Sequence, residues 1–152
     1  MELKNIKEYL PKVFEIVDKD QNTERIVFNS DVMSKENINY PIYRAISDAQ
    51  HDSGLSFNFS YEIASRAVDI LSEIDDWNDD DAVTEAVDSS VPIYNNVLMK
   101  IYQSDHWAVD EAVKEMGIGD DSIKNAQYGW YMQIEQMTEA IKSNLLELVE
   151  AE

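Results

Sequence analysis

The densest group of chemically active side chains is the run Asp75-Asp76-Trp77-Asn78-Asp79-Asp80-Asp81. Carboxylates packed this closely can bind a divalent cation, or they can stand in for phosphates in front of a basic partner. The spacing Asp76-x-Asn78-x-Asp80 resembles the start of a calcium loop, and Asp18-x-Asp20-x-Asn22 repeats it. Both segments lack the glycine that turns such a loop and the final bidentate glutamate. We therefore expect no calcium site.

Other metal and catalytic chemistry has even less support. The chain has no cysteine, which excludes disulfides and thiolate ligands, and its only histidines are His51 and His106. It carries no glycine-rich phosphate loop and no nucleophile elbow, and its carboxylates are too numerous for one acid–base pair to stand out. The sequence predicts no catalytic residue, no metal and no cofactor, so we do not expect an enzyme.

The charge balance is the strongest functional signal. Twelve Lys and Arg face 31 Asp and Glu, a net charge of −19 on 152 residues. Residues 1–60 are nearly balanced, with seven basic and ten acidic side chains, whereas residues 61–152 carry five and 21. Proteins that hold nucleic acid are cationic on the working face, so we expect no direct nucleic-acid binding. A dense anionic surface can instead compete for the cationic face of such a protein.

The candidate partner-binding face follows the helix expected over 62–74 and the acidic run after it. As one helix, residues 62–80 would carry a charge about every 4 Å, close to the roughly 3.4 Å spacing of phosphates along a DNA strand. A solvated face that only keeps the protein soluble is the alternative. The candidate residues are Glu62, Asp69, Glu73, Asp75, Asp76, Asp79, Asp80, Asp81, Glu85 and Asp88.

Apolar residues recur three or four positions apart along most of the chain, which predicts helices. Ile26-Val27-Phe28 fits a small strand or a loop that touches the core. We expect an all-α fold in a single domain, 1–152: a bundle of six or seven helices, with a small irregular or β segment near 22–30. The expected helices are Leu3–Val17 (kinked at Pro11 or divided there into two short helices), 41–50, Glu62–Ile74, Ala82–Asp88, one from Ser89 or Ser90 to Tyr102 with Pro92 in its first turn, Trp107–Met116, and a last and longest one from 120–122 to Val149.

The apolar stripes of these helices also predict the core. The aromatic group Tyr128, Trp130 and Tyr131 is assigned to packing rather than to base stacking, because a stacking platform needs nearby cations. No segment has the roughly 20 apolar residues of a membrane span, and the N-terminus lacks an apolar signal core, so we expect a cytoplasmic protein. The expected core residues are Ile63, Ala67, Ile70, Leu71, Val97, Leu98, Ile101, Trp130, Ile134, Met137 and Ile141.

The segment Asp79–Asp105, DDDAVTEAVDSSVPIYNNVLMKIYQSD, resembles the acidic antirestriction proteins of phages of the Ocr (overcome classical restriction) type. The shared features are an acidic stretch, an Ala-rich helix start, and Val91-Pro92 followed by Tyr94. The last helix, from Gln127 to Ile134 and on to an acidic end, is also similar in character. The likeness covers about half the chain, and some 60 N-terminal residues fall outside it.

The resemblance implies an all-helical dimer that imitates DNA and blocks the DNA channel of a host-defence enzyme. It carries over the acidic character of Asp79, Asp80, Asp81 and Asp88. The function expected is inhibition of a CRISPR effector or restriction-type enzyme in the cytoplasm of an infected bacterium, with the effector's cationic DNA-binding surface as the partner. The alternative is an acidic assembly or accessory protein with an apolar interface anchored by Trp77, Tyr102 and Trp107.

Overall fold

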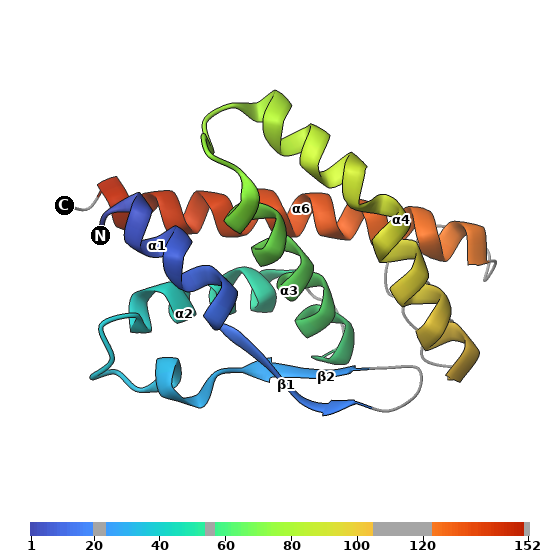
Figure 1. The fold of residues 1–152 in the computed structure, drawn as a ribbon, viewed down its shortest axis with the longest axis horizontal. Coiled ribbons are helices and arrows are strands. Elements are labelled where there is room, and N and C mark those ends of the chain that lie inside the picture. Colours follow the sequence, from blue (N-terminus) through green and yellow to red (C-terminus); the bar gives the residue numbers. More distant parts are fainter. Residues whose placement is uncertain (20–23, 54–56, 105–122, 151–152) are drawn as a thin grey trace.

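A computed structural model gives the structure of the chain and describes residues 1–19, 24–53, 57–104 and 123–150 (Figure 1). These residues form a mostly helical fold with one two-stranded sheet. In chain order the elements are α1 (Leu3–Tyr9), the 3-10 turn η1 (Leu10–Lys12), β1 (Phe14–Lys19), β2 (Glu24–Phe28), the 3-10 turn η2 (Ser30–Met33), α2 (Tyr40–Asp52), α3 (Phe57–Glu73), α4 (Asp80–Ser104) and α6 (Ile123–Glu150).

The last helix, α6, is the centre of the fold. It runs along the long axis of the molecule and contacts α1, α2, α3 and α4 (Figure 1). Asn144 Nδ2 donates a hydrogen bond to Ala45 O on α2 (3.0 Å), and the amino group of Met1 donates to Leu148 O (3.1 Å). The N-terminus therefore lies beside the last turns of α6.

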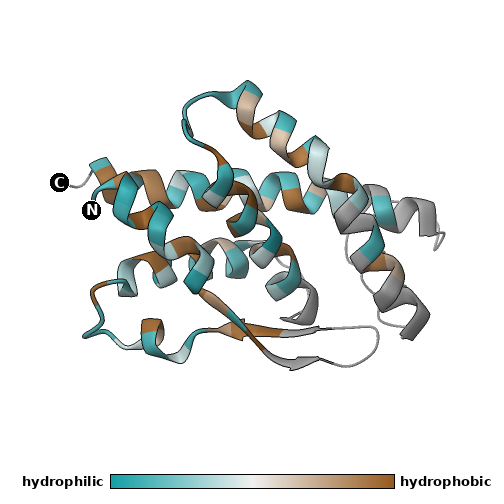
Figure 2. Cartoon of the chain, in the orientation of Figure 1, coloured by the Kyte–Doolittle hydropathy of each residue, from teal (hydrophilic) through white to brown (hydrophobic). Residues whose placement is uncertain are grey.

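The hydrophobic core lies where these helices meet, and Figure 2 shows the hydrophobic residues concentrated on their inner faces. Its expected members are confirmed wherever their side chains are described, because apolar residues at helical spacing share one face. Val97 and Ile101 lie outside the described side chains. The confirmed core residues are Ile63, Ala67, Ile70, Leu71, Leu98, Trp130, Ile134, Met137 and Ile141.

The N-terminal helix is shorter than expected. Pro11 has no N–H to donate and its ring clashes with the preceding turn, so α1 ends at Tyr9 and a single 3-10 turn follows. The prediction of a helix to Val17 is wrong, because the chain from Phe14 pairs as β1 with antiparallel β2. Phe14 lies opposite Phe28, with ring centroids 4.6 Å apart. The apolar run at 26–28 is therefore a strand.

The helix expected to end near Asp88 and the one expected to begin at Ser89 or Ser90 form one helix, α4, with Pro92 inside it. Figure 1 shows that α4 changes direction along its length, as a helix with an internal proline does. Asp88 and Pro92 are both exposed, so water can hydrate the Asp88 carbonyl that has lost its helical donor.

The described residues thus contain five α-helices. The expected helix Trp107–Met116 lies outside them, and so does the expected start of the last helix at 120–122. Residues 20–22 of the calcium-like segment Asp18-x-Asp20-x-Asn22 also lie outside them. Within the described ranges, no helix is both long enough and apolar enough to cross a membrane.

Candidate acidic surface

The acidic run forms the connection between α3 and α4, and it folds around a buried tryptophan. Trp77 is fully buried, and its Nε1 donates a hydrogen bond to Leu71 O (2.9 Å) at the end of α3. The prediction that Trp77 is an exposed interface anchor is therefore wrong. An indole that packs its ring and also satisfies its N–H fixes the surrounding polar turn in place.

The aspartates of this turn also organise the local backbone. Asp76 Oδ1 accepts a hydrogen bond from the Asn78 N–H (3.0 Å), and Asp79 Oδ1 accepts one from the Ala82 N–H (3.2 Å). Asp79 is thus the N-cap of α4 and satisfies one of the free N–H groups at its start. Asp80 and Asp81 occupy the first turn, where the helix dipole favours negative charge.

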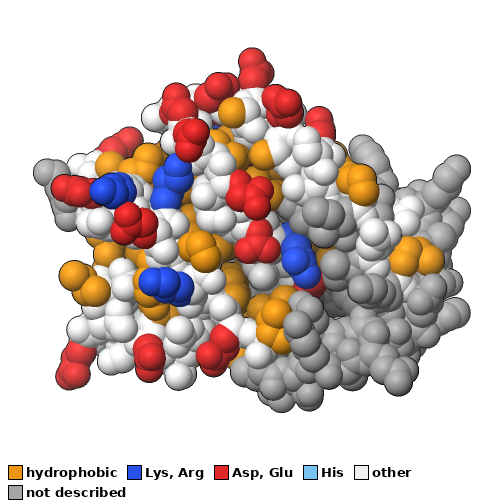
Figure 3. Space-filling model, viewed as in Figure 1, with side chains coloured by type: hydrophobic (Ala, Val, Ile, Leu, Met, Phe, Trp, Pro, Cys, Tyr) orange, Lys and Arg blue, Asp and Glu red, His pale blue; other side chains and the backbone are white. Residues whose placement is uncertain are grey.

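Of the ten acids predicted to form the face, all except Glu62 are exposed. They lie on the second half of α3, on the turn and on the first half of α4. Because α3 ends at Glu73 and α4 begins at Asp80, they do not form one straight helical row with phosphate-like spacing. They form instead a bent acidic surface, which in Figure 3 covers the upper edge of the molecule.

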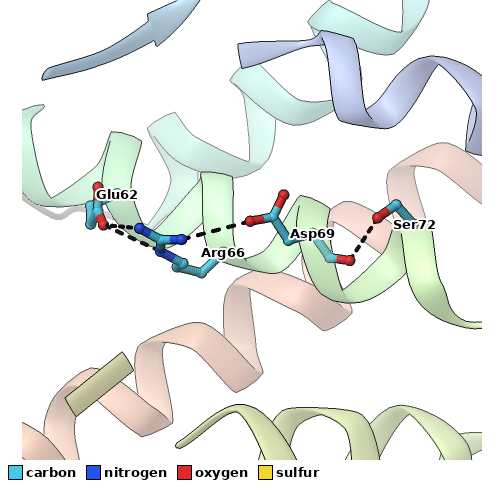
Figure 4. A network of polar contacts seen from close by, with 4 residues as sticks. All are labelled: Glu62, Arg66, Asp69 and Ser72. Carbon is cyan, nitrogen blue, oxygen red and sulfur yellow. Dashed lines mark hydrogen bonds and ion pairs between the residues drawn. The ribbon is translucent and has the colours of Figure 1, made fainter. Parts of the chain in front are cut away.

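Glu62 is the exception, and its expected exposure is wrong. Its side chain is only 8% exposed, and Arg66 Nη2 and Nε both donate to its Oε1, at 2.8 and 3.2 Å (Figure 4). Arg66 also lies 3.8 Å from Asp69, and Ser72 Oγ donates to Asp69 O (2.7 Å). Partial burial raises the pKa of the Asp69 carboxyl, with Arg66 opposing the rise and Glu73 adding to it.

Helix α6 adds acids that the sequence did not assign to the face. Lys142 Nζ lies 3.0 Å from Glu139 Oε2 and 3.3 Å from Asp80 Oδ1, so one buried lysine links α6 to the start of α4. Burial alone would lower the pKa of Lys142, but the hydrogen bonds to Glu139 and Asp80 outweigh it and raise the pKa. The i, i+3 spacing of Glu139 and Lys142 is a sequence signal for their pair within α6, whereas no local spacing indicates the contact with Asp80.

Tyr131 makes a second connection between the same helices. Its hydroxyl donates to Asp88 Oδ1 on α4 (2.6 Å) and lies 3.2 Å from Glu135 Oε2 on its own helix. The hydrogen bond to Asp88, followed by burial and by Glu135, raises the pKa of the Tyr131 phenol above its ordinary value. Glu135 and Glu139 therefore border the acidic surface beside Asp88 and Asp80.

The described acidic surface presents exposed negative charge. No cluster of three or more potential metal-ligating side chains occurs in the described ranges. In the calcium-like segment 76–80, the Asp76 carboxylate accepts a hydrogen bond from a backbone amide and the Asp80 carboxylate contacts Lys142. Comparison of the chain with protein-family models, with curated proteins and with solved structures found no match. The resemblance to phage antirestriction proteins stays a prediction.

Proposed function

We propose that the protein inhibits a nucleic-acid-targeting defence system of a bacterial host, either a CRISPR effector or a restriction-type enzyme, by occupying its cationic DNA-binding surface. The observation that carries this proposal is the acidic surface: nine exposed carboxylates from α3, the turn and α4, held on a corner that buried Trp77 anchors. The protein acts without catalysis and does not bind nucleic acid itself.

The surface keeps a large excess of negative charge after its internal ion pairs are counted. Arg66 faces Asp69, Lys142 faces Asp80 and Glu139, and Lys7 Nζ lies 3.9 Å from Asp75 Oδ1. Glu73, Asp81 and Glu85 are exposed and have no ion pair or side-chain hydrogen bond in the described part of the chain. They are free to accept charge-assisted hydrogen bonds from a partner's Lys and Arg side chains.

Electrostatics also sets how such an inhibitor would act. A net charge of −19 speeds the approach of a cationic surface and repels a competing polyanion such as DNA. Binding is expected to be fast at low salt and to weaken as salt screens the exposed charges. The bend between α3 and α4 means that the surface need only complement the partner's charges, without reproducing the geometry of a DNA strand.

The test is a gel-shift competition with labelled duplex DNA and a purified DNA-targeting CRISPR effector or restriction enzyme. The protein is expected to abolish the effector's DNA shift and to produce no shift alone. The variant Glu73→Lys/Asp81→Lys/Glu85→Lys should weaken inhibition by about tenfold or more, because like charges then face each other across the interface. These three residues are chosen because they leave Asp79, Asp76 and Lys142 intact.

The matched control is Glu15→Lys/Glu36→Lys/Glu147→Lys, which changes the net charge equally at exposed acids away from the acidic surface. It should inhibit nearly as well as the natural protein. Equal losses in both variants would show that total charge matters and the acidic surface does not. Full inhibition by the first variant, or direct salt-sensitive binding to bare DNA, would contradict the proposal.

An acidic assembly or accessory protein with an apolar interface is the second candidate. One observation favours it: Ile38, just before α2, is 82% exposed, and Met33 is also exposed. Of the predicted aromatic anchors, Trp77 is buried, and the side chains of Tyr102 and Trp107 lie outside the described part. Association with a partner that persists at about 1 M salt, where screening falls to about 3 Å, would favour this function.

A further inference from the structure

A pocket lies at the other end of α3, away from the acidic turn between α3 and α4. Its volume is about 240 Å³, and residues of β2, α2 and α3 line it. Volumes below roughly 300 Å³ suit a side chain or a small molecule better than a coenzyme or nucleotide. The lining residues are Phe28, Tyr43, Ser47, Gln50, His51, Ser60 and Tyr61.

Three aromatic rings form the walls of this pocket. The rings of Phe28 and Tyr43 lie edge to face, with centroids 4.9 Å apart and planes at 88° to each other. The rings of Phe28 and Tyr61 are also edge to face, with centroids 5.5 Å apart and planes at 71°. Phe28 is buried and contacts both tyrosine rings, so it restricts their positions. Perpendicular rings present π-faces on more than one side of a cavity, and such faces attract cations.

Three polar residues of the pocket, Ser47, Gln50 and Ser60, are buried, and one oxygen each of Ser47 and Gln50 makes no hydrogen bond in the described structure. Gln50, only 9% exposed, donates from Nε2 to Ser60 Oγ (2.9 Å), which orients its amide and leaves the carbonyl Oε1 unpartnered in the described structure. Ser47 is 5% exposed, and its hydroxyl makes no hydrogen bond there. Neither oxygen is itself fully buried, so both can accept hydrogen bonds from a ligand that enters the pocket and donates them.

The charge of the surroundings selects among such ligands. The described residues that line the pocket include no Lys or Arg, and the protein carries a net charge of −19, so phosphates and carboxylates are disfavoured. A purely apolar ligand would leave Gln50 Oε1 and the Ser47 hydroxyl buried without partners. A guanidinium group is planar and weakly hydrated, stacks on aromatic rings and has five N–H donors, whereas an ammonium is compact and strongly hydrated.

We propose that this pocket is a guanidinium-binding site, in which Tyr43 and Tyr61 stack on the planar cation while Gln50 Oε1 and the Ser47 hydroxyl accept its hydrogen bonds. The group arrives on an arginine side chain of a partner protein or on a small alkylguanidine. The site is distinct from the acidic surface, because Tyr61 and Asp69, the first exposed acid of that surface, are eight positions and about 12 Å apart along α3.

The test is an NMR titration of the ¹⁵N-labelled protein at physiological salt with methylguanidinium, with methylurea as the uncharged planar control and methylammonium as the compact cation. Methylguanidinium should give saturable shifts at the amides around Tyr43–His51 and Ser60–Tyr61. The two controls should bind about tenfold more weakly, because each lacks either the charge or the planar fork of donors. A short peptide with one arginine distinguishes the sources: tighter binding than methylguanidinium identifies a partner's side chain, and equal binding a small molecule.

Substitutions of the lining residues test which side chains bind the guanidinium group. Tyr43→Leu removes a wall and Gln50→Leu removes the acceptor at similar size, and each should weaken methylguanidinium binding about tenfold. Tyr9→Leu, at a half-buried tyrosine on α1, is the matched control and should leave it unchanged. If Gln50→Leu fails to fold, Ser47→Ala removes the other proposed hydrogen-bond acceptor of the pocket and should weaken methylguanidinium binding severalfold.

Four outcomes would overturn the proposal. These are the absence of saturable shifts with methylguanidinium, equal binding of methylurea, shifts confined to the acidic residues 73–88, and unchanged affinity in both Tyr43→Leu and Ser47→Ala. Shifts at the acidic residues alone would show general attraction of cations to the negative surface. Equal binding of methylurea would assign the pocket to an uncharged planar ligand.

Discussion

At the C-terminal end of α3, acidic side chains are exposed and many of them bond to the protein itself. Near its N-terminal end, two oxygens of buried residues on α2, Gln50 Oε1 and the Ser47 hydroxyl, make no hydrogen bond within the described residues. Asp79 caps α4 and Asp76 closes the turn, so part of the acidic run is explained by local structure. Gln50 Oε1 and the Ser47 hydroxyl have no such role. The density of charge is therefore a weaker guide to a binding site than unsatisfied bonding capacity.

The comparison also separates two kinds of acid on one surface. Asp76, Asp79, Asp80 and Asp88 have partners within the protein, so their carboxylates are partly committed. Glu73, Asp81 and Glu85 are exposed without such partners and are the groups most available to another molecule. Stability measurements can test this division directly, because only the first group should matter for folding.

The largest effect is expected at the anchor of the acidic turn. Trp77→Ala should lower the free energy of unfolding by about 3–5 kcal/mol, because it leaves a cavity where a fully buried indole packed. Urea denaturation followed by circular dichroism measures the loss. Trp77→Phe should cost less, since it keeps much of the packing and loses the bond to Leu71 O. A loss below about 1 kcal/mol in Trp77→Ala would mean that the turn has no buried anchor.

Asp79→Ala should cost about 1 kcal/mol, because the first N–H groups of α4 lose their cap. Glu85→Ala, an exposed acid one turn into the same helix, should change the free energy of unfolding by less than about 0.5 kcal/mol. The same denaturation experiment compares the two variants. Equal effects would remove the distinction between capping acids and available acids.

Tyr131→Phe should cost about 0.5 kcal/mol near neutral pH through the lost hydrogen bond to Asp88. The pKa of Tyr131 is raised in the folded protein, so its contribution is complete below the unfolded pKa of about 10 and declines as the pH rises above it. Unfolding measured from about pH 8 to about pH 11 should therefore show a smaller decline in Tyr131→Phe than in the natural protein. Identical pH dependence would show that the phenol does not bridge α4 and α6.

The smallest effect should have the opposite sign. Ser47→Ala should stabilise the protein by about 0.5 kcal/mol, because alanine favours the helix and the hydroxyl that is removed makes no hydrogen bond in the described structure. Thermal unfolding detects this as a slightly higher Tm. A clear loss of stability would show that Ser47 already has a structural partner, and the comparison between the two ends of α3 would fail.

Much of the helical architecture was predictable from the sequence, because it depends on periodicity within single segments. The stripe Ile63, Ala67, Ile70 and Leu71 is buried, and α2 begins with Pro41 in its first turn, as expected. The predictions of secondary structure are wrong where contacts with distant residues or the surroundings of a residue determine the local conformation. Phe14 extends toward β2 because Phe28 lies opposite it, and α4 continues through Pro92 on an exposed face that tolerates the lost hydrogen bond.

The sequence by itself determined the charge, the absence of thiol chemistry, the apolar stripes and the exposure of nine of the ten predicted acids, since each is a property of residue types at fixed spacing. Only the tertiary structure decided that Glu62 is buried beside Arg66, that Trp77 anchors the turn, and that Lys142 joins α6 to Asp80. It also brought β2, α2 and α3 together around the aromatic pocket. Such contacts join residues far apart in the chain, and no local pattern encodes which distant side chain will fill a given space.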